Sequence, residues 1–358
     1  MNHHVHARLM RGYDIHLTDG IDPPFVFIEK ALSKGMRMFG LRGLYAGFSA
    51  RRLDNIAASV HARTDGSAAL DFYHGATSWL HVRRSRPYAC YLDACFATYM
   101  NVYQDSGAFS RRQIAELSSK EARFLSGAVA VFFSSEWALR DCVSRYGIPD
   151  AHMHVAGLGG GFPGSGDGTP AVRPHFLFIG HDFKGKGGDT VMEAFMRLKG
   201  LHPQIRMVVA GQRPPEAYLE TDGVEYVGVI DKSKPQGLAR MRELFQTATC
   251  FVLPTSKDMT PLVLIEAASL GCPVISTRSY GIPEIVDDGI TGLLVDPGAG
   301  MADRVFACME RMLTEPGLRS GMGAAASLHA RQHLTWEQAG GRIFDTLAAC
   351  GFASGHAA

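Results

Sequence analysis

The sequence lacks the features that mark extracellular, membrane-spanning or nucleic-acid-binding proteins. Its seven cysteines include no Cys-x-x-Cys pair, and an odd number of scattered thiols favours reduced cysteines over a disulfide framework. No window approaches the roughly eighteen apolar residues of a membrane span, and no basic-then-apolar leader opens the chain. The formal net charge of +1 is not the excess of lysine and arginine that a phosphate backbone rewards. These absences predict a cytoplasmic protein whose main partner is not a nucleic acid.

Composition and spacing indicate a globular chain of two domains. Its 358 residues, 46% hydrophobic and 20% charged, are enough for two domains rather than one. Residues 157–168, GLGGGFPGSGDG, are rich in glycine, serine and proline, which is typical of an interdomain linker. We therefore expect a first domain over residues 1–163, a second over 172–334 and a closing segment over 335–358.

Short apolar runs alternate with helical patterns in the second domain, which predicts a parallel, doubly wound α/β sheet. Its strands are expected at 175–180, 205–211, 224–230, 249–254, 272–277 and 293–295, with helices near 190–198, 236–247 and 261–270. A weaker pattern of the same kind predicts first-domain strands at 13–18, 70–74, 88–93 and 128–135. Residues 1–11 lack the strand and glycine-rich turn that usually open a Rossmann-like domain, so that strand is expected to be absent or supplied differently.

The segment 175–195, HFLFIGHDFKGKGGDTVMEAF, predicts a strand, a glycine-rich turn with two lysines, and a helix. Such a turn can hold phosphate oxygens, because glycines let backbone N–H groups approach and the helix N-terminus adds positive potential. Lys186 is the expected phosphate ligand, with Lys184 as the second choice. The spacing comes within one residue of a Walker A loop, but Gly187 stands where a serine or threonine must bind magnesium, which argues against an ATPase.

Two acidic residues are associated with the helix expected at 261–270. Glu266 is the one charged residue on this apolar helix, where a carboxylate is costly unless it is paired or hydrogen-bonded. The hydroxyls of a bound polyol can satisfy it, and so can a backbone N–H, a lysine or an arginine; the sequence leaves both alternatives open. Asp258 lies just before the helix, where it can cap the N-terminus or accept a second hydroxyl.

The segment 278–298 predicts another helix opening and a turn. Gly281 comes shortly before Pro283, which is the expected first residue of a helix. The free N–H groups of that helix opening could meet phosphate or sugar oxygens. Asp287 and Asp288 are expected to form a turn rather than to bind metal. The histidines at the start of the chain have no cysteine or carboxylate neighbours, so no metal site is predicted.

The stretch from residue 30 to residue 63 is basic and interleaved with apolar residues. Asp54 is its one acid, and its bases are Lys30, Lys34, Arg37, Arg42, Arg51, Arg52 and Arg63. This pattern fits peripheral contact with the inner face of a membrane, a site for an anionic acceptor, or a solvated helix face. The sequence does not choose among these.

Residues 174–300 resemble the donor-binding domain of glycosyltransferase family 4, a group of retaining enzymes with the GT-B fold. The matching pieces are IGHDFKGKGGD, FVLPTSKDMTPLVLIEAASLGCPVIST and GIPEIVDDGITGLLVDP, in the family's order and spacing. Residues 128–159 resemble the last strand and helix of the family's first domain, and 335–347 its closing helix. The resemblance implies two Rossmann-like domains that face a cleft, with the closing segment returning toward the first domain.

The resemblance also implies roles for individual residues. Lys186 would bind the donor diphosphate and assist catalysis, Glu266 would bind the ribose hydroxyls, and Asp258 would take the first place of the family's Glu-x7-Glu pair and contact the transferred sugar. His74 and Asp93, at the ends of first-domain strands, are the other catalytic candidates, although each can equally satisfy backbone groups. The expected donor site comprises Gly180, His181, Lys186, Asp258, Met259, Thr260, Leu262, Glu266 and Gly281.

The sequence departs from the family pattern at several positions. Asp258 is one methylene shorter than the usual glutamate, and His181 stands where many members have a diphosphate-binding arginine. Tyr280 replaces one glycine of the pair before Ile-Pro-Glu, and Leu92 takes the histidine place of the family's acceptor-side His-Asp pair. The donor sugar therefore cannot be carried over from the family.

The resulting expectation is a metal-independent glycosyltransferase without a cofactor. It would move a sugar from a nucleoside-diphosphate sugar to a glycan or lipid-linked acceptor with retention, and the nucleotide base would lie near residues 229–231. Three alternatives stay open. A GT-B-fold epimerase would convert its sugar nucleotide without an acceptor, a non-catalytic subunit would bind the nucleotide without turnover, and a kinase or ATPase would need magnesium.

Overall fold

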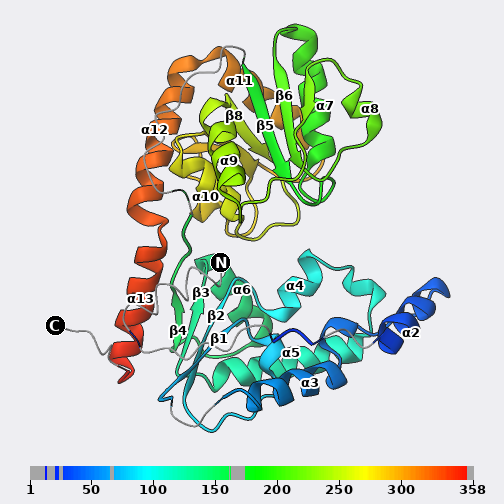
Figure 1. Cartoon of the computed structure of the whole chain (residues 1–358), viewed down its shortest axis with the longest axis vertical. Helices are drawn as coiled ribbons and strands as arrows, with labels where there is room; N and C mark the ends of the chain where they lie inside the picture. The colour runs from blue at the N-terminus through cyan, green and yellow to red at the C-terminus, as the bar shows by residue number, and fades with distance from the viewer. Residues whose placement is uncertain are drawn as a thin grey trace. The chain divides into compact units, whose positions relative to one another are not determined.

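The structure is a computed structural model, and it describes residues 13, 21–23, 27–64, 68–160, 162 and 174–352. The chain divides into two compact units (Figure 1). Unit 1 contains the residues up to Gly157 together with those from Trp336 onward, and unit 2 runs from Leu158 to Thr335. The division falls at the start of the glycine-rich segment.

In the described part of unit 2, six parallel strands form one sheet in the order β10-β9-β8-β5-β6-β7. They are β5 (His175–Gly180), β6 (Arg206–Gly211), β7 (Val224–Tyr226), β8 (Cys250–Leu253), β9 (Val274–Thr277) and β10 (Gly292–Val295). From β5 the chain adds β6 and β7 on one side, and from β8 it adds β9 and β10 on the other side. The winding therefore reverses between β5 and β8. Unit 2 therefore has the doubly wound, Rossmann-like sheet that the sequence predicts.

The helices of unit 2 follow its strands in alternation. They are α7 (Gly188–Leu201), α8 (Glu216–Leu219), α9 (Pro235–Thr247), α10 (Leu262–Ser269), α11 (Met301–Thr314) and α12 (Pro316–His333), with the 3-10 turn η4 (Ile282–Glu284). Strands β8, β9 and β10 are buried at every position. A sheet covered on both faces selects continuous apolar runs, which is why these strands coincide with the predicted ones.

Two expectations for unit 2 differ from the structure. β7 ends at Tyr226 instead of continuing to residue 230, because Gly228 takes a left-handed φ of +81° and Val229 is exposed. The helix expected at Pro283 is only the single turn η4. Its hydrogen bonds link residues three apart, as in the bond from the Ile285 N–H to the Ile282 carbonyl oxygen at 2.9 Å.

The described part of unit 1 holds four parallel strands in the sequential order β1-β2-β3-β4. They are β1 (Asp71–His74), β2 (Tyr88–Leu92), β3 (Ala130–Phe133) and β4 (Met153–Val155). The first three lie within predicted runs, whereas β4 has no predicted counterpart because so short a run carries little periodicity. The strand expected at 13–18 lies outside the described residues except for Tyr13, whose hydroxyl donates to the carbonyl oxygen of Phe352 at 2.8 Å.

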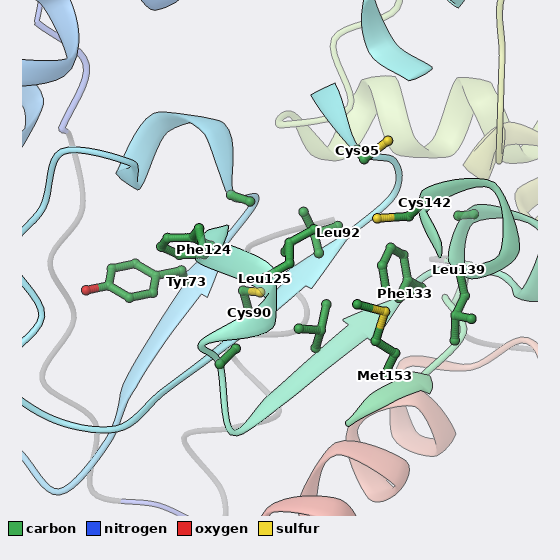
Figure 2. Packing of buried hydrophobic residues seen from close by; sticks show 14 of the residues in the cluster. Tyr73, Cys90, Leu92, Cys95, Phe124, Leu125, Phe133, Leu139, Cys142 and Met153 are labelled. Carbon is green, nitrogen blue, oxygen red and sulfur yellow. The ribbon is translucent and has the colours of Figure 1, made fainter. Parts of the chain in front are cut away.

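Both faces of the unit 1 sheet carry a hydrophobic core. The helical elements of unit 1 are α2 (Phe27–Met38), η1 (Ala46–Phe48), α3 (Ala50–His61), η2 (Thr77–Trp79), α4 (Phe96–Val102), η3 (Ser106–Ala108), α5 (Arg111–Ser126), α6 (Glu136–Tyr146) and α13 (Trp336–Ala349). On one face, Phe133 of β3 packs with Phe124 of α5 and Leu139 of α6 (Figure 2). On the other face, Phe132 belongs to a cluster with Ile343 of α13, so the returning segment completes the core of unit 1.

Gly211, the last residue of β6, is a position that only glycine fits. Its φ is +100°, and a Cβ there would lie 2.2 Å from the carbonyl oxygen of Gly180 in β5. We expect Gly211→Ala to lower the free energy of unfolding by at least about 2 kcal/mol, because the strained backbone and the clash act together. Gly200→Ala is the control: a Cβ there meets nothing within 4 Å, and alanine in α7 should raise stability by about 0.5–1 kcal/mol. Urea unfolding followed by circular dichroism measures both, and equal stabilities would contradict the prediction.

Candidate functional site

The reversal between β5 and β8 brings two loops together at the carboxyl edge of the unit 2 sheet. One is the turn 181–187 after β5, and the other is the loop 254–261 after β8. In doubly wound sheets, ligands bind at such a reversal because the loops on either side leave in opposite directions. Both loops carry predicted donor-site residues, so this edge is the candidate site.

The turn after β5 is closed by its own backbone. The Asp182 carbonyl oxygen accepts from the Lys186 N–H, and an Asp182 carboxylate oxygen accepts from the Gly185 N–H, both at 2.9 Å. Gly187 has a φ of +84°, and a Cβ on it would lie 2.3 Å from the carbonyl oxygen of Pro254. A serine or threonine does not fit at position 187, so the turn cannot carry the magnesium-binding hydroxyl of a P-loop.

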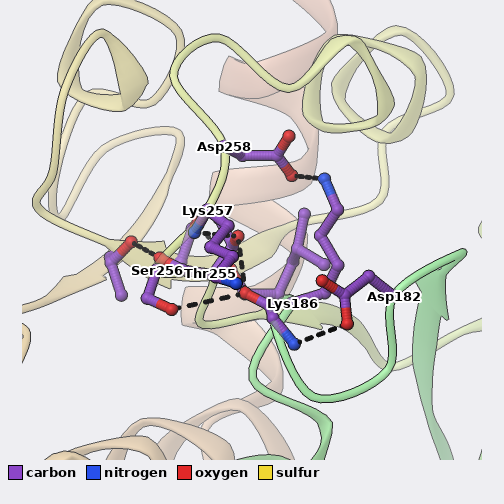
Figure 3. Close-up of polar contacts among 10 residues, drawn as sticks. Asp182, Lys186, Thr255, Ser256, Lys257 and Asp258 are labelled. Atoms are coloured by element: carbon purple, nitrogen blue, oxygen red, sulfur yellow. Dashed lines mark hydrogen bonds and ion pairs between the residues drawn. The ribbon is translucent and has the colours of Figure 1, made fainter. Parts of the chain in front are cut away.

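Hydrogen bonds hold this turn against the loop after β8 (Figure 3). The Gly185 carbonyl oxygen accepts from the Ser256 N–H at 3.3 Å. It also accepts from the hydroxyls of Thr255 and Ser256, each at 3.4 Å. The Thr255 carbonyl oxygen in turn accepts from the Thr277 hydroxyl of β9 at 2.8 Å. The two loops therefore form one frame around the side chain of Lys186.

Within this frame, Lys186 reaches from the turn to Asp258 in the facing loop (Figure 3). Its Nζ donates to Oδ2 of Asp258, and the two side chains are 22% and 12% exposed. Burial raises the pKa of the Asp258 carboxyl, and the nearby Lys186 charge opposes that rise. The predicted phosphate ligand and the predicted sugar contact are thus the two halves of one ion pair.

The alternative predicted role of Asp258, as the N-cap of α10, is wrong. Pro261 occupies the N-cap position, and no side chain caps the helix. A buried carboxylate needs a charged partner, and Lys186 supplies it from the facing turn.

Glu266 is the second buried acid of the site. It lies on α10, is 8% exposed, and its Oε1 accepts from the Nζ of Lys232 at 2.6 Å. Its Oε2 is buried and has no hydrogen-bond partner among the residues that the structure describes. A lysine therefore satisfies one oxygen, as one sequence alternative proposed, while the other oxygen has no donor from the described protein.

Lys232 is the residue of the site that the sequence pattern does not reveal. It lies between β7 and α9, 34 positions before Glu266, in a DKSK run that is typical of a solvated loop. Its side chain is 46% exposed, so the ammonium contacts Glu266 while remaining open to solvent. The one signal in the sequence is its position directly after residues 229–231, where the nucleotide base is expected.

Four further predicted residues lie at the ends of β5 and α10. Gly180 ends β5, where a Cβ would lie 3.1 Å from the Cγ of Lys186, so the glycine leaves room for that side chain. His181 follows it and is exposed. Thr260 and Leu262 lie at the start of α10 and are partly exposed. The first N–H groups of a helix have no partner inside it, so this end can donate to a ligand.

The loop before η4 joins the site through its backbone. The Gly281 N–H donates to the carbonyl oxygen of Met259 at 3.0 Å, and the Tyr280 hydroxyl donates to the carbonyl oxygen of Ser256 at 3.2 Å. Tyr280 has a φ of +55°, and within the described ranges it is the one non-glycine residue with a positive φ. The tyrosine thus keeps a left-handed backbone that glycine adopts more easily, and its hydroxyl tethers it to the loop after β8.

His74 and Asp93 lie at the same edge of the unit 1 sheet. β1 and β2 are parallel neighbours in which His74 pairs with Tyr91, so Asp93 follows two positions beyond that pair. Asp93 is exposed and His74 is half-buried. Leu92, which takes the family's histidine place, is 2% exposed and packs in the core, so it contributes no polar group to this edge.

Asp287 and Asp288 form a turn, as predicted. The Asp287 carbonyl oxygen accepts from the Thr291 N–H, and Oδ1 of Asp288 accepts from the Leu294 N–H, both at 2.8 Å. Oδ2 of Asp288 accepts from Arg278 at 2.5 Å. Across the described ranges, no group of three or more His, Cys, Asp or Glu is arranged to hold a metal ion.

Comparison with solved structures identifies the architecture. Sucrose-phosphate synthase (tll1590) from Thermosynechococcus elongatus matches over 83% of this chain and 78% of its own, with a TM-score of 0.66 and 19% identity. Anabaena Alr3699/HepE, solved in complex with UDP-glucose, matches over 83% and 82%, with a TM-score of 0.62 and 15% identity. At these identities the likeness concerns the fold alone, and that fold is GT-B.

Comparison of sequences matches unit 2 to a known family. Residues 168–329 match the family described as glycosyl transferases group 1. D-inositol 3-phosphate glycosyltransferase of Thermobifida fusca (strain YX) is 33% identical over 182 residues, which are 48% of this chain and 41% of the relative. The enzyme of the same name from Kribbella flavida is 33% identical over 240 residues, 61% of this chain and 55% of the relative. The chain thus spans about half the length of the curated relatives that it matches.

The ion pair between Lys186 and Asp258 predicts a pH-dependent loss of stability. Lys186→Ala leaves a buried carboxylate without its cation, so we expect a loss of about 3 kcal/mol at neutral pH. The pKa of Asp258 is already raised by burial and should rise further. A group with a higher pKa in the folded state favours folding when protonated, so the loss should shrink as the pH falls to about pH 5, toward the ordinary aspartate range.

The double variant Lys186→Ala/Asp258→Asn supplies the control for this prediction, because it has no carboxylate to protonate. Its stability relative to the wild type should not recover on acidification. Urea unfolding of all three proteins at neutral and mildly acidic pH makes the comparison. A loss in Lys186→Ala that is the same at both pH values would rule out the buried charge as its cause.

Proposed function

We propose that this chain is a retaining glycosyltransferase that moves a sugar from a nucleoside-diphosphate sugar to a saccharide or lipid-linked acceptor, without a metal ion or cofactor. Unit 2 would bind the donor at the carboxyl edge of its sheet. The family of residues 168–329 and the GT-B fold support the class of reaction. The pairs Lys186–Asp258 and Lys232–Glu266 support the location of the donor site at this edge.

The observation that carries the proposal is the unsatisfied oxygen of Glu266. A buried acceptor without a donor costs about 1–3 kcal/mol, and a ligand hydroxyl would remove that cost. Lys232 already occupies Oε1, so Oε2 is the oxygen that a ligand hydroxyl would contact. The hydroxyls of a ribose supply such donors, and Glu266 occupies the ribose-binding position in the family pattern.

Lys186 would supply positive charge to the donor diphosphate. When the donor binds, its Nζ would be shared between a phosphate oxygen and Asp258. The raised pKa of Asp258 makes its protonation easier, so the acid can contact a sugar hydroxyl with less repulsion of the phosphate. As the bond between sugar and diphosphate breaks, charge grows on the leaving group, and a lysine already held in place stabilises it.

The acceptor side would belong to unit 1. His74 and Asp93 lie at one edge of its sheet and are the groups we propose to contact the acceptor. The acceptor hydroxyl would attack from the side of the leaving diphosphate, which gives retention. A lipid-linked acceptor would bring the chain to a membrane surface.

Calorimetric titration with UDP, GDP and ADP in the presence of EDTA tests the donor site. We expect one of the three to bind, and Lys186→Ala and Glu266→Ala each to weaken it by about 10- to 100-fold, because each removes a hydrogen bond that involves a charged group. Lys232→Ala should weaken binding by about tenfold or less, because Glu266 remains but is no longer oriented.

Lys184→Ala is the matched control for this titration, since Lys184 is an exposed lysine of the same turn. It should leave the affinity within about twofold, as expected for a surface charge. If no nucleotide binds, or if Lys184→Ala weakens binding as much as Lys186→Ala, the donor site is not at this edge.

The reaction class is tested with sugar nucleotides of the base that binds. We expect transfer to a saccharide or lipid-linked acceptor in EDTA, a product with the donor's anomeric configuration by proton NMR, and a loss of at least about 100-fold in rate for Lys186→Ala. Conversion of the donor without an acceptor would instead identify an epimerase. Nucleotide binding without any turnover would identify a non-catalytic subunit, and magnesium-dependent ATP hydrolysis a kinase or ATPase.

A further inference from the structure

Exposed apolar side chains are concentrated at one place in unit 1. Of the fourteen large apolar residues that are exposed in the described chain, eight lie on α2 and in the six residues after it: Phe27, Ile28, Leu32, Met36, Met38, Phe39, Leu41 and Leu44. Phe27 and Phe39 are 80% and 85% exposed. Single exposed apolar residues are common on soluble proteins, but a contiguous group marks a surface that contacts something else. We call these eight residues the α2 surface.

The orientation of α2 is the reverse of that of an ordinary surface helix. Ser33 is buried and its hydroxyl donates to the carbonyl oxygen of Leu44 at 2.6 Å, while the Arg37 guanidinium lies 5.2 Å from the centre of the Phe109 ring. Residues four apart share one side of a helix, so the side with Ser33 and Arg37 faces unit 1. The side with Phe27, Ile28 and Met38 faces away from it, and all three side chains are largely exposed. A helix that packs its small polar side inward and its apolar side outward is not explained by the core of its own domain.

The contacts around α2 fix this orientation. The Gly43 N–H donates to the carbonyl oxygen of Ala108 at 2.9 Å, and a Cβ on Gly43 would lie 2.3 Å from the Ser33 hydroxyl oxygen. Gly40, two residues after the end of α2, has a left-handed backbone, and the Leu41 N–H donates to the carbonyl oxygen of Met36 at 2.9 Å. This six-to-one bond is the Schellman motif, which turns the chain while continuing the apolar surface into the following loop. Figure 1 shows α2 at the periphery of unit 1, beyond α3 and α5.

Most charges beside the α2 surface are basic, and Glu29 is the one acid of α2. Lys30, Lys34 and Arg42 are exposed among its apolar residues. In the following helix, α3, Arg52 has a different role. It is buried, and its guanidinium donates to the carbonyl oxygen of Gly47 and to the carboxylate of Asp22. The bases of the stretch 30–63 therefore have two different roles. Arg52 stabilises the fold, whereas the bases of α2 and of the following loop lie beside exposed apolar side chains.

We propose that the α2 surface inserts into the headgroup layer of a membrane that contains anionic lipids. An amphipathic helix with an outward apolar face and flanking lysines and arginines lies in the plane of such an interface. Its apolar residues then enter the boundary with the acyl chains, and its bases meet lipid phosphates. Unit 1 holds the helix by Ser33 and Gly43, so the surface is presented without unfolding of the domain. This docking does not depend on the proposed transferase activity.

Sedimentation of the full chain with lipid vesicles tests the proposal. We expect binding to vesicles of phosphatidylcholine and phosphatidylglycerol in equal parts, and much weaker binding to phosphatidylcholine alone. Leu32→Ser/Phe39→Ser should lower the partition onto anionic vesicles by at least about tenfold, because two inserted apolar side chains are lost. Lys34→Gln should lower it by about fivefold at low salt.

Leu201→Ser is the matched control, because Leu201 at the end of α7 is 62% exposed, the same fraction as Leu32. It should bind vesicles like the wild type. The proposal is overturned if the wild type binds neither kind of vesicle, or if Leu32→Ser/Phe39→Ser and Leu201→Ser bind equally well. Size-exclusion chromatography with light scattering adds a second readout: a dimer that Leu32→Ser/Phe39→Ser abolishes, in a chain that ignores vesicles, would assign the α2 surface to a second copy of the chain.

Discussion

Asp258 and Lys186 come from loops that are 72 positions apart in the chain, and each would be costly to bury alone. Their pairing fixes the loop after β8 against the turn after β5, at the point where the strand order of unit 2 reverses. The position of α10 depends on that loop, because the helix begins four residues after Asp258. Glu266 is placed by α10 in turn, so the ion pair sets the geometry of both acids that face the candidate site.

The fold of unit 2 could be predicted from the sequence because its sheet is covered on both faces. Burial of whole strands leaves continuous apolar runs bounded by glycine and proline, and such runs can be located by inspection; β5 has the predicted bounds, 175–180. The isolated charge of Glu266 on an apolar helix was equally visible. Prediction was weaker in unit 1, where β4 has only three residues and leaves no period to detect.

The sequence could not predict which distant side chains pair, or which side of a helix faces the core. Lys232 sits in a charged loop that resembles any solvated loop, and only the folded chain brings it to Glu266. Asp258 could serve a helix end or a distant cation, and spacing alone does not distinguish the two. An amphipathic pattern also reads the same whether its apolar side faces inward or outward. The direction of α2 is fixed by Ser33 and Gly43, two small residues that carry no hydrophobic signal.

The return of α13 to unit 1 has a consequence for the order in which the protein is made. Ile343 and Leu347 complete one face of the unit 1 sheet, yet they follow all of unit 2 in the chain. During synthesis from the N-terminus, that face stays uncovered on the ribosome while unit 2 is translated and can fold. Unit 2, which is continuous in the sequence, can therefore close its core first, and unit 1 reaches its final packing only after α13 has emerged.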